Sequence, residues 1–222
     1  MRINSTAIRG NTGLSPSIRS TLTNTFYTVS AMMGVTALTG VASLGLHLGF
    51  GASLALVAAS IAVLFLVRSN QNNGMGLALL AVFAAIQGLA LGPVLSHYLR
   101  MTGGPAVVAS AAALTAVATF ACAVYASRTQ TFSNLGAYLF GGLLVLLVAM
   151  LIGIFVPIPA FHLAISAFGA LLFIGFLLYD IGKVKSGVET NYISASISIY
   201  LDVLNLFEML LRILGIVNSS RD

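Results

Sequence analysis

Residues 135–156 read LGAYLFGGLLVLLVAMLIGIFV and contain no charged side chain. A helix over this stretch would be about 33 Å long at 1.5 Å per residue, which matches the roughly 30 Å of hydrocarbon in a bilayer. The stretch is therefore typical of a helix that crosses a membrane.

Six further apolar blocks accompany this stretch, with short polar or Gly/Pro joints between them. They cover residues 26–49, 52–67, 76–99, 106–126, 160–179 and 193–217. Only 7% of the chain is charged and 59% is hydrophobic, whereas a soluble domain usually carries about 25% charged residues. We expect an all-α integral membrane protein, a bundle of about seven transmembrane helices. Residues 1–24 would be a flexible cytosolic N-terminal tail and residues 25–222 a single transmembrane domain.

Several other classes are disfavoured. The net charge is +5, but the basic residues are scattered singly and form no stripe that could follow a phosphate backbone, so we expect no nucleic-acid partner. The one cysteine, Cys122, leaves no disulfide framework and no CxxC motif. No nucleophile elbow, phosphate loop or zinc-protease motif is present, so we expect neither an enzyme nor a cofactor. His47, His97 and His162 lack the spacing of a zinc site.

Lys and Arg indicate the orientation, because they concentrate in cytosolic loops. With a cytosolic N-terminus and seven crossings, the inside would hold Arg2, Arg9, Arg19, Arg68, Arg128, Lys183 and Lys185, and the outside Arg100, Arg212 and Arg221. Two alternatives remain open. A re-entrant last segment would return the C-terminus to the cytosol, and the acid-free start could be a transit peptide, although Gly10, Gly13 and Pro16 disfavour the amphipathic helix of such peptides.

Small residues predict close helix packing. Gly88 and Gly92 form a GxxxG pattern in the third block, and Gly141 with Gly142 form a similar face in the fifth. Membrane helices approach closely at small residues, because lipid tails supply no hydrophobic force between them. Pro93 predicts a kink beside the first pattern.

The last block carries a polar stripe. At 100° per residue, an arc of roughly 120° contains its polar side chains, which are Ser194, Ser198, Asp202, Asn205, Glu208 and Arg212. Glu208 and Arg212 are four residues apart and predict a structural ion pair. Asp202 has no such local partner and lies about 15 Å into the span, where an ionisable group is costly and a functional candidate.

Two more charged residues lie toward the same, cytosolic side. Asp180 ends the sixth block and Arg68 ends the second. Two neighbouring carboxyl groups tend to share one proton, and an arginine can clamp the ionised state. Alternatively, Asp180 faces interfacial water and Arg68 is only a topological anchor.

Several sequence segments resemble those of a known family. The segments GLALGPVLSHYL (88–99), FHLAISAFGALLF (161–173), LLYDIGKV (177–184) and SIYLDVLNLFEMLLRILG (198–215), with a terminal SRD, are similar to the Bax inhibitor-1 family and to its bacterial YccA branch. The resemblance covers the whole chain after residue 24.

This resemblance implies a bacterial inner-membrane protein with one of two functions. Members of the YccA branch are implicated as partners and modulators of FtsH, a membrane-bound ATP-dependent protease. Other members behave as pH-sensitive calcium leak channels, in which the positions of Asp180 and Asp202 form a proton-sharing pair latched by that of Arg68. Calcium would then be a transported ion with transient contacts at Asp180 and Asp202. Ser198, Asn205, Glu208 and Arg212 would support this site.

Overall fold

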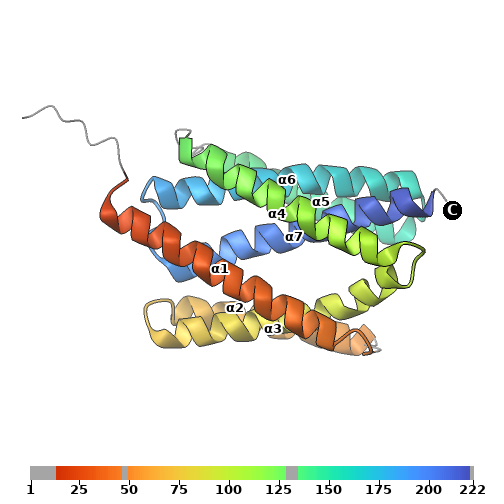
Figure 1. Ribbon diagram of the computed structural model, residues 1–222, viewed down its shortest axis with the longest axis horizontal. Coiled ribbons are helices and arrows are strands. Elements are labelled where there is room, and N and C mark those ends of the chain that lie inside the picture. The colour runs from red at the N-terminus through yellow and green to blue at the C-terminus, as the bar shows by residue number, and fades with distance from the viewer. Residues whose placement is uncertain (1–13, 47–49, 129–134, 221–222) are drawn as a thin grey trace, which may run out of the picture.

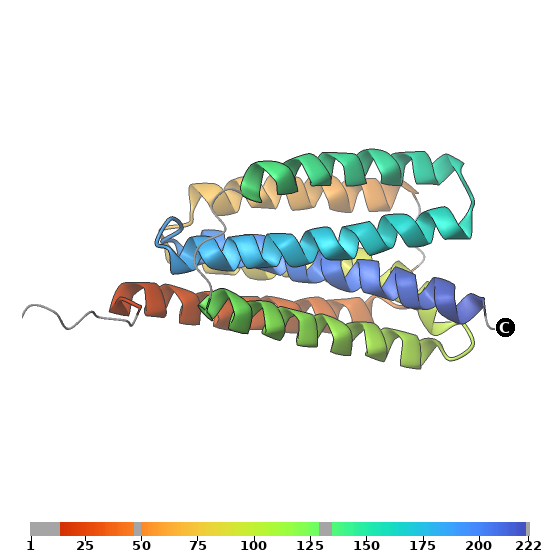
Figure 2. The ribbon, with the colours of Figure 1, turned by 90° about the horizontal axis from the view of Figure 1, so that it is seen from above.

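The computed structural model describes residues 14–46, 50–128 and 135–220. In this part of the chain there are seven α-helices: α1 (Pro16–Ala42), α2 (Phe50–Ser69), α3 (Gly74–Leu99), α4 (Gly104–Arg128), α5 (Gly136–Phe155), α6 (Pro159–Lys185) and α7 (Tyr192–Ser219). They run side by side along one long axis (Figures 1 and 2). The all-α bundle predicted from the apolar blocks is confirmed.

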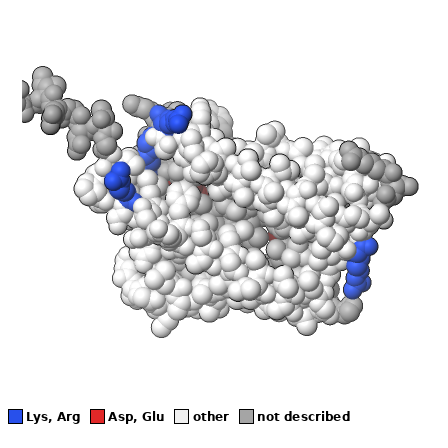
Figure 3. Space-filling model, viewed as in Figure 1, with Lys and Arg blue, Asp and Glu red and all other residues white. Residues whose placement is uncertain are grey.

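Consecutive helices run in opposite directions, so charged residues collect at two ends. We call one the basic end, which holds Arg19, Arg68, Arg128, Lys183 and Lys185. The other is the C-terminal end, with Arg100, Arg212 and the last turn of α7. Figure 3 shows Lys and Arg only at the extremes of the visible face. Among the described helices α1, α3, α4, α5 and α6 are long and apolar enough to cross a membrane, so this is a multi-pass membrane protein.

The helix α7 occupies the centre of the bundle. It packs on α6, α4, α1 and α3, and it is one continuous helix of 28 residues, about 42 Å long. It starts at the basic end and finishes at the opposite end (Figure 1). The helix contains no break at which a re-entrant segment could turn back. Its polar residues are tolerated because neighbouring helices, rather than lipid, surround most of its surface.

The helix α1 begins earlier than predicted. It starts at Pro16, where the Ser15 side chain accepts a hydrogen bond from Ile18 N at 3.4 Å. Residues 16–24 are thus helical and do not belong to a flexible tail, which corrects the predicted boundary at residue 24. The hydrophobic pattern missed this start because a Ser cap followed by Pro at the first helical position favours a helix whether or not its first turns are apolar. Residues 1–13 lie outside the described part.

Glycines bring α3 against α1, as predicted. A Cβ on Gly88 would lie 2.5 Å from the Thr36 carbonyl oxygen, and one on Gly92 would lie 2.8 Å from the Ser43 Cβ. In the second glycine pair only Gly142 makes a close contact, with Leu172 of α6, whereas a Cβ on Gly141 would meet open space. The helix α3 continues through Pro93 to Leu99.

Candidate functional site: a buried carboxyl pair between α6 and α7

Asp180 and Asp202 meet at the interface between α6 and α7. Asp180 lies in the last turns of α6 and Asp202 lies about ten residues into α7. Because the two helices are antiparallel and extensively packed, both positions fall in the half of the bundle nearer the basic end. Both side chains are buried, with 9% and 6% of the residue surface exposed. The two carboxyl groups are within hydrogen-bonding reach of each other.

The pair needs a shared proton to be satisfied. Asp202 Oδ2 is buried and receives no hydrogen bond from any donor in the described residues. A carboxylate can only accept, so the two acids can hydrogen-bond to each other only when one of them is protonated. Two adjacent ionised carboxylates would also repel strongly where little water screens them. The geometry therefore suits a site that holds one proton between two acids.

The cation beside the pair is Lys183. Its Nζ lies 3.1 Å from Asp180 Oδ1, one turn along α6, and this is the one salt bridge within residues 14–46, 50–128 and 135–220. The same ammonium lies 5.1 Å from the centre of the Tyr179 ring. Its side chain is 30% exposed, so it links the buried pair to the basic end. Sequence reasoning missed this partner, although the i, i+3 spacing of Asp180 and Lys183 in LLYDIGKV indicated it.

Arg68 does not contact either acid. It is exposed at the end of α2, in a polar recess formed with Gln71, Glu189 and Ser194. The physical reason is that α2 packs against α3 rather than against α6. Ser198 lies one turn deeper in the crevice between α2 and α7, which Arg68 also lines. Arg68 and Ser198 thus line the approach to α7 from the basic end, and the expected clamp is not formed in this conformation.

The α6–α7 connection is tied to the α2–α3 connection at this recess. Asn191 Oδ1 caps α7 by accepting from Ile193 N at 2.9 Å, and its Nδ2 donates to the Gln71 carbonyl at 3.0 Å. Glu189 Oε2 accepts a hydrogen bond from Ser194 Oγ at 2.8 Å. These contacts hold the start of α7, and therefore the register of Asp202, against two other helices.

The second half of the polar stripe, from Asn205 to Arg212, lies toward the C-terminal end. Asn205 is half-buried. The Arg212 guanidinium attracts the Glu208 carboxyl group electrostatically, and it is within hydrogen-bonding reach of the Tyr98 hydroxyl of α3. No Glu208–Arg212 salt bridge within 4 Å forms in the described chain, so the predicted ion pair is not a direct contact. Tyr98 competes for the guanidinium, and α-helical spacing alone could not reveal that competitor.

A hydrogen-bonded node lies at the centre of the bundle. The hydroxyls of Thr36 in α1 and Tyr200 in α7 are 2.6 Å apart, and Thr36 Oγ1 lies 3.0 Å from the Ala84 carbonyl oxygen of α3. Thr36 is 2% exposed and Tyr200 is fully buried. The node joins three helices two residues from Asp202. Sequence analysis missed it because Thr and Tyr are common on apolar helices.

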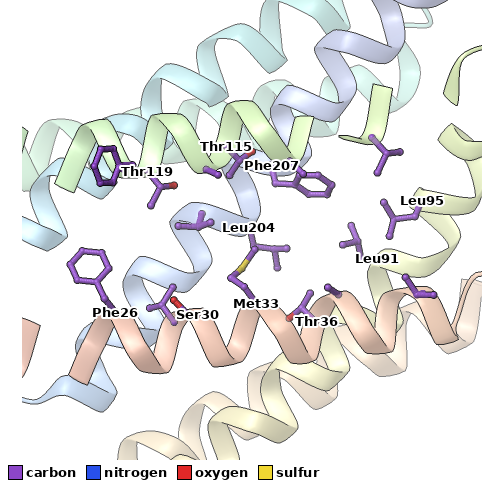
Figure 4. A pocket seen from close by; sticks show the side chains of 18 of the residues that line it. Phe26, Ser30, Met33, Thr36, Leu91, Leu95, Thr115, Thr119, Leu204 and Phe207 are labelled. Carbon is purple, nitrogen blue, oxygen red and sulfur yellow. The ribbon is translucent and has the colours of Figure 1, made fainter. Parts of the chain in front are cut away.

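An apolar cleft of about 840 Å³ separates α1 from α4 and reaches the surface of α7 (Figure 4). Phe26 and Met33 of α1 face Thr115 and Thr119 of α4 across it, with Leu204 behind (Figure 4). No titratable side chain lines it. The cleft therefore offers neither a proton carrier nor a carboxylate ligand.

Possible metal ligands are dispersed. In the ranges that the structure describes, no three His, Cys, Asp or Glu side chains gather in one place. His97 and His162 both line a cavity at the C-terminal end, whereas His47 lies outside the described residues. Asp180 and Asp202 alone would supply carboxylate oxygens, which are ligands suited to Ca²⁺.

Comparison with known proteins assigns the chain to a family. The sequence model of the inhibitor of apoptosis-promoting Bax1 matches residues 18–219. The chain belongs to the Bax inhibitor-1 family.

Three relatives show which proteins this member of the Bax inhibitor-1 family is similar to. A membrane protein of Vibrio cholerae is 40% identical over 201 residues, which cover 90% of each chain. The modulator of FtsH protease YccA of Escherichia coli K12 is 36% identical over 202 residues, 90% of this chain and 91% of that one. The Golgi anti-apoptotic protein of vaccinia virus is 37% identical over 170 residues, 75% and 70% of the two chains. The predicted likeness to the Bax inhibitor-1 family and its YccA branch is confirmed.

Proposed function

We propose that this protein is a non-enzymatic regulator in the bacterial inner membrane that binds the FtsH protease and modulates its activity. The observation that carries the proposal is the relation to YccA, a protein named as a modulator of FtsH protease, over nine-tenths of both chains. A YccA homologue is also named an inner membrane protein. This coverage matters because most of the bundle has a counterpart in that relative.

The packing of the bundle supports a regulator that resists the protease it binds. Pulling the chain apart would have to remove α7 from contacts with four helices and break the buried bond between Thr36 and Tyr200. Lys185 adds a further tie, because its ammonium donates to the carbonyl oxygens of Ala126 and Ser127 at the end of α4. Such a protein could occupy FtsH without being extracted quickly.

The test is co-purification and substrate turnover. Affinity-tagged protein in bacterial membranes should retain FtsH after solubilisation in mild detergent, and its overexpression should lengthen the half-life of an FtsH membrane substrate in a pulse-chase experiment. An unrelated multi-pass protein at equal abundance is the control. Absence of both effects would refute the proposal.

The carboxyl pair favours a second candidate function, a pH-sensitive calcium leak. When the shared proton leaves, two carboxylates face each other between α6 and α7, with Lys183 as the cation at 3.1 Å from Asp180 and Glu189 near enough to repel Asp180. The repulsion would separate the two helices and offer oxygen ligands to a hard cation. Arg68 in its recess would act as a latch on α7 only after a movement of α2.

This candidate is tested by flux in liposomes. Calcium release from vesicles that contain the purified protein, measured from pH 6 to pH 8, should rise with pH as the pair loses its proton. A flux that is absent, or that does not change with pH, would refute the leak and leave the FtsH proposal untouched, because the latter rests on turnover in membranes.

A further inference from the structure

The C-terminal end of the bundle contains a second large cavity, far from the carboxyl pair along α7. It has a volume of about 1160 Å³ and lies between the last turns of α3, α5 and α7 and the first turns of α6. Small-molecule pockets usually span roughly 300–1,000 Å³, so this cavity can take a bulky ligand. Neither of the proposed functions uses it.

One wall of the cavity is polar and carries only positive or neutral groups. Arg212, His97, His162 and Tyr98 line it, and no acidic side chain does. Glu208, on the preceding turn of α7, attracts Arg212 electrostatically. In the described residues, however, Glu208 makes no ion pair within 4 Å. The guanidinium therefore has hydrogen-bonding capacity left over. Arginine presents a planar fork of donors that matches the oxygens of a phosphate.

The opposite wall is apolar and open to the surrounding lipid. It is formed by one face of α5, where Leu147, Leu151 and Ile154 line the cavity. These side chains are 49%, 61% and 74% exposed, respectively. In a membrane protein this face of α5 meets hydrocarbon, because no described helix other than α6 packs extensively on α5.

The two walls lie side by side at the same end of the bundle. Arg212 is seven residues before the end of α7, and His97 is in the last turn of α3. Leu147 is eight residues before the end of α5, and Leu151 lies one turn closer to that end. One amphipathic ligand can therefore contact the polar wall and the apolar wall together.

We propose that this cavity binds an anionic phospholipid. The phosphate group would accept hydrogen bonds from the Arg212 guanidinium, and an acyl chain would lie along Leu147 and Leu151 of α5. A zwitterionic phospholipid carries the same phosphate together with a cationic group that Arg212 would repel, so the site should prefer a net negative headgroup.

The absence of tryptophan from the chain makes this testable with a single reporter. Leu151→Trp places the reporter in the cavity, and Val117→Trp places a control on α4, where the side chain is 66% exposed and outside the cavity. Each protein is reconstituted in mixed vesicles of phosphatidylglycerol and phosphatidylcholine with one lipid brominated. Quenching then gives the preference for each lipid at each position.

We expect phosphatidylglycerol to be favoured about fivefold at Leu151→Trp, the effect of one basic residue on an anionic lipid, and not at Val117→Trp. Adding Arg212→Gln should reduce the ratio to that of the control, while Arg212→Lys should retain most of it. The comparison between the two reporters leaves Arg212 intact. Equal preferences for phosphatidylglycerol at Leu151→Trp and Val117→Trp would overturn the proposal. Loss of the preference on adding inorganic phosphate would overturn it too, because the site would then hold a free anion without its acyl chain.

Discussion

Single residues decide the chemistry inside the bundle, where little water is available to satisfy polar groups. Asp180 and Asp202 are buried together, and a hydrogen bond between them requires a proton that belongs to both. Lys183 makes the only ion pair to this site in the described chain. A change of one side chain should therefore change the charge of the whole site.

Replacing Asp202 should separate the two proposed functions. In Asp202→Asn the amide can donate to Asp180, so no proton needs to be shared. We expect calcium flux in liposomes to lose its rise with pH, while FtsH substrates keep the half-life seen with the unmodified protein. Thr119→Val, in the apolar cleft between α1 and α4, is the control and should keep the pH dependence. A pH-dependent flux in Asp202→Asn would contradict the role of the pair.

The Thr36–Tyr200 bond should be measurable as a coupling energy. Thr36→Val and Tyr200→Phe each remove one hydroxyl of the 2.6 Å contact. Thr36→Val leaves the Tyr200 hydroxyl without this partner, whereas in Tyr200→Phe the Thr36 hydroxyl can still donate to the Ala84 carbonyl oxygen. The double variant should be less destabilised than the sum of the two, by about 0.6–1.7 kcal/mol, the range of interhelical hydrogen bonds in membranes. Unfolding with a denaturing detergent in mixed micelles measures the four proteins. Strict additivity would show that the two hydroxyls do not interact.

At the scale of helices, the small residues of α3 set its distance from α1. These two helices form one of the most extensive contacts of the bundle, and Gly88 lies where a side chain would collide with backbone. Gly88→Ala should force α1 and α3 apart and lower the free energy of unfolding by about 1–3 kcal/mol. Gly141→Ala meets open space and should change it by less than about 0.5 kcal/mol. Equal effects would mean that the loss of glycine flexibility, not the close approach, dominates.

The segment before α1 is the element that we expect FtsH to engage. Deleting residues 2–14 retains Ser15, whose side chain caps α1, so the bundle should fold and insert as before. We expect the deletion to abolish FtsH co-purification. A Gly/Ser segment of equal length in place of residues 2–14 tests whether length alone suffices. Unchanged binding by the deletion variant would place the FtsH contact on the bundle itself.

At the scale of the whole molecule, the alternating helices carry basic residues to one end. The positive-inside rule predicts that this end faces the cytosol. In a Cys122→Ser background, Val188→Cys reports on the basic end and Thr102→Cys on the C-terminal end, since both sites are exposed. We expect a membrane-impermeant maleimide to label Thr102→Cys in intact spheroplasts and Val188→Cys only after lysis. The reverse pattern would invert the topology.

The amino-acid sequence alone was sufficient to predict the membrane class, the seven helices and the axial position of Asp180 and Asp202. The thickness of hydrocarbon requires apolar blocks of a given length, and their order along an antiparallel bundle places the two acids in the same half. Their spacing along the chain also placed Gly88 and Gly92 on one packing face.

Only the tertiary structure decided which side chains meet. Periodicity places a residue along a helix, but the rotation of that helix and the identity of its neighbours follow from packing over the whole bundle. For this reason Arg68, at the correct end, lies in a recess with Glu189, while Lys183 takes the place beside Asp180. The same packing joins Thr36 to Tyr200 and turns Arg212 toward Tyr98 and a cavity open to lipid.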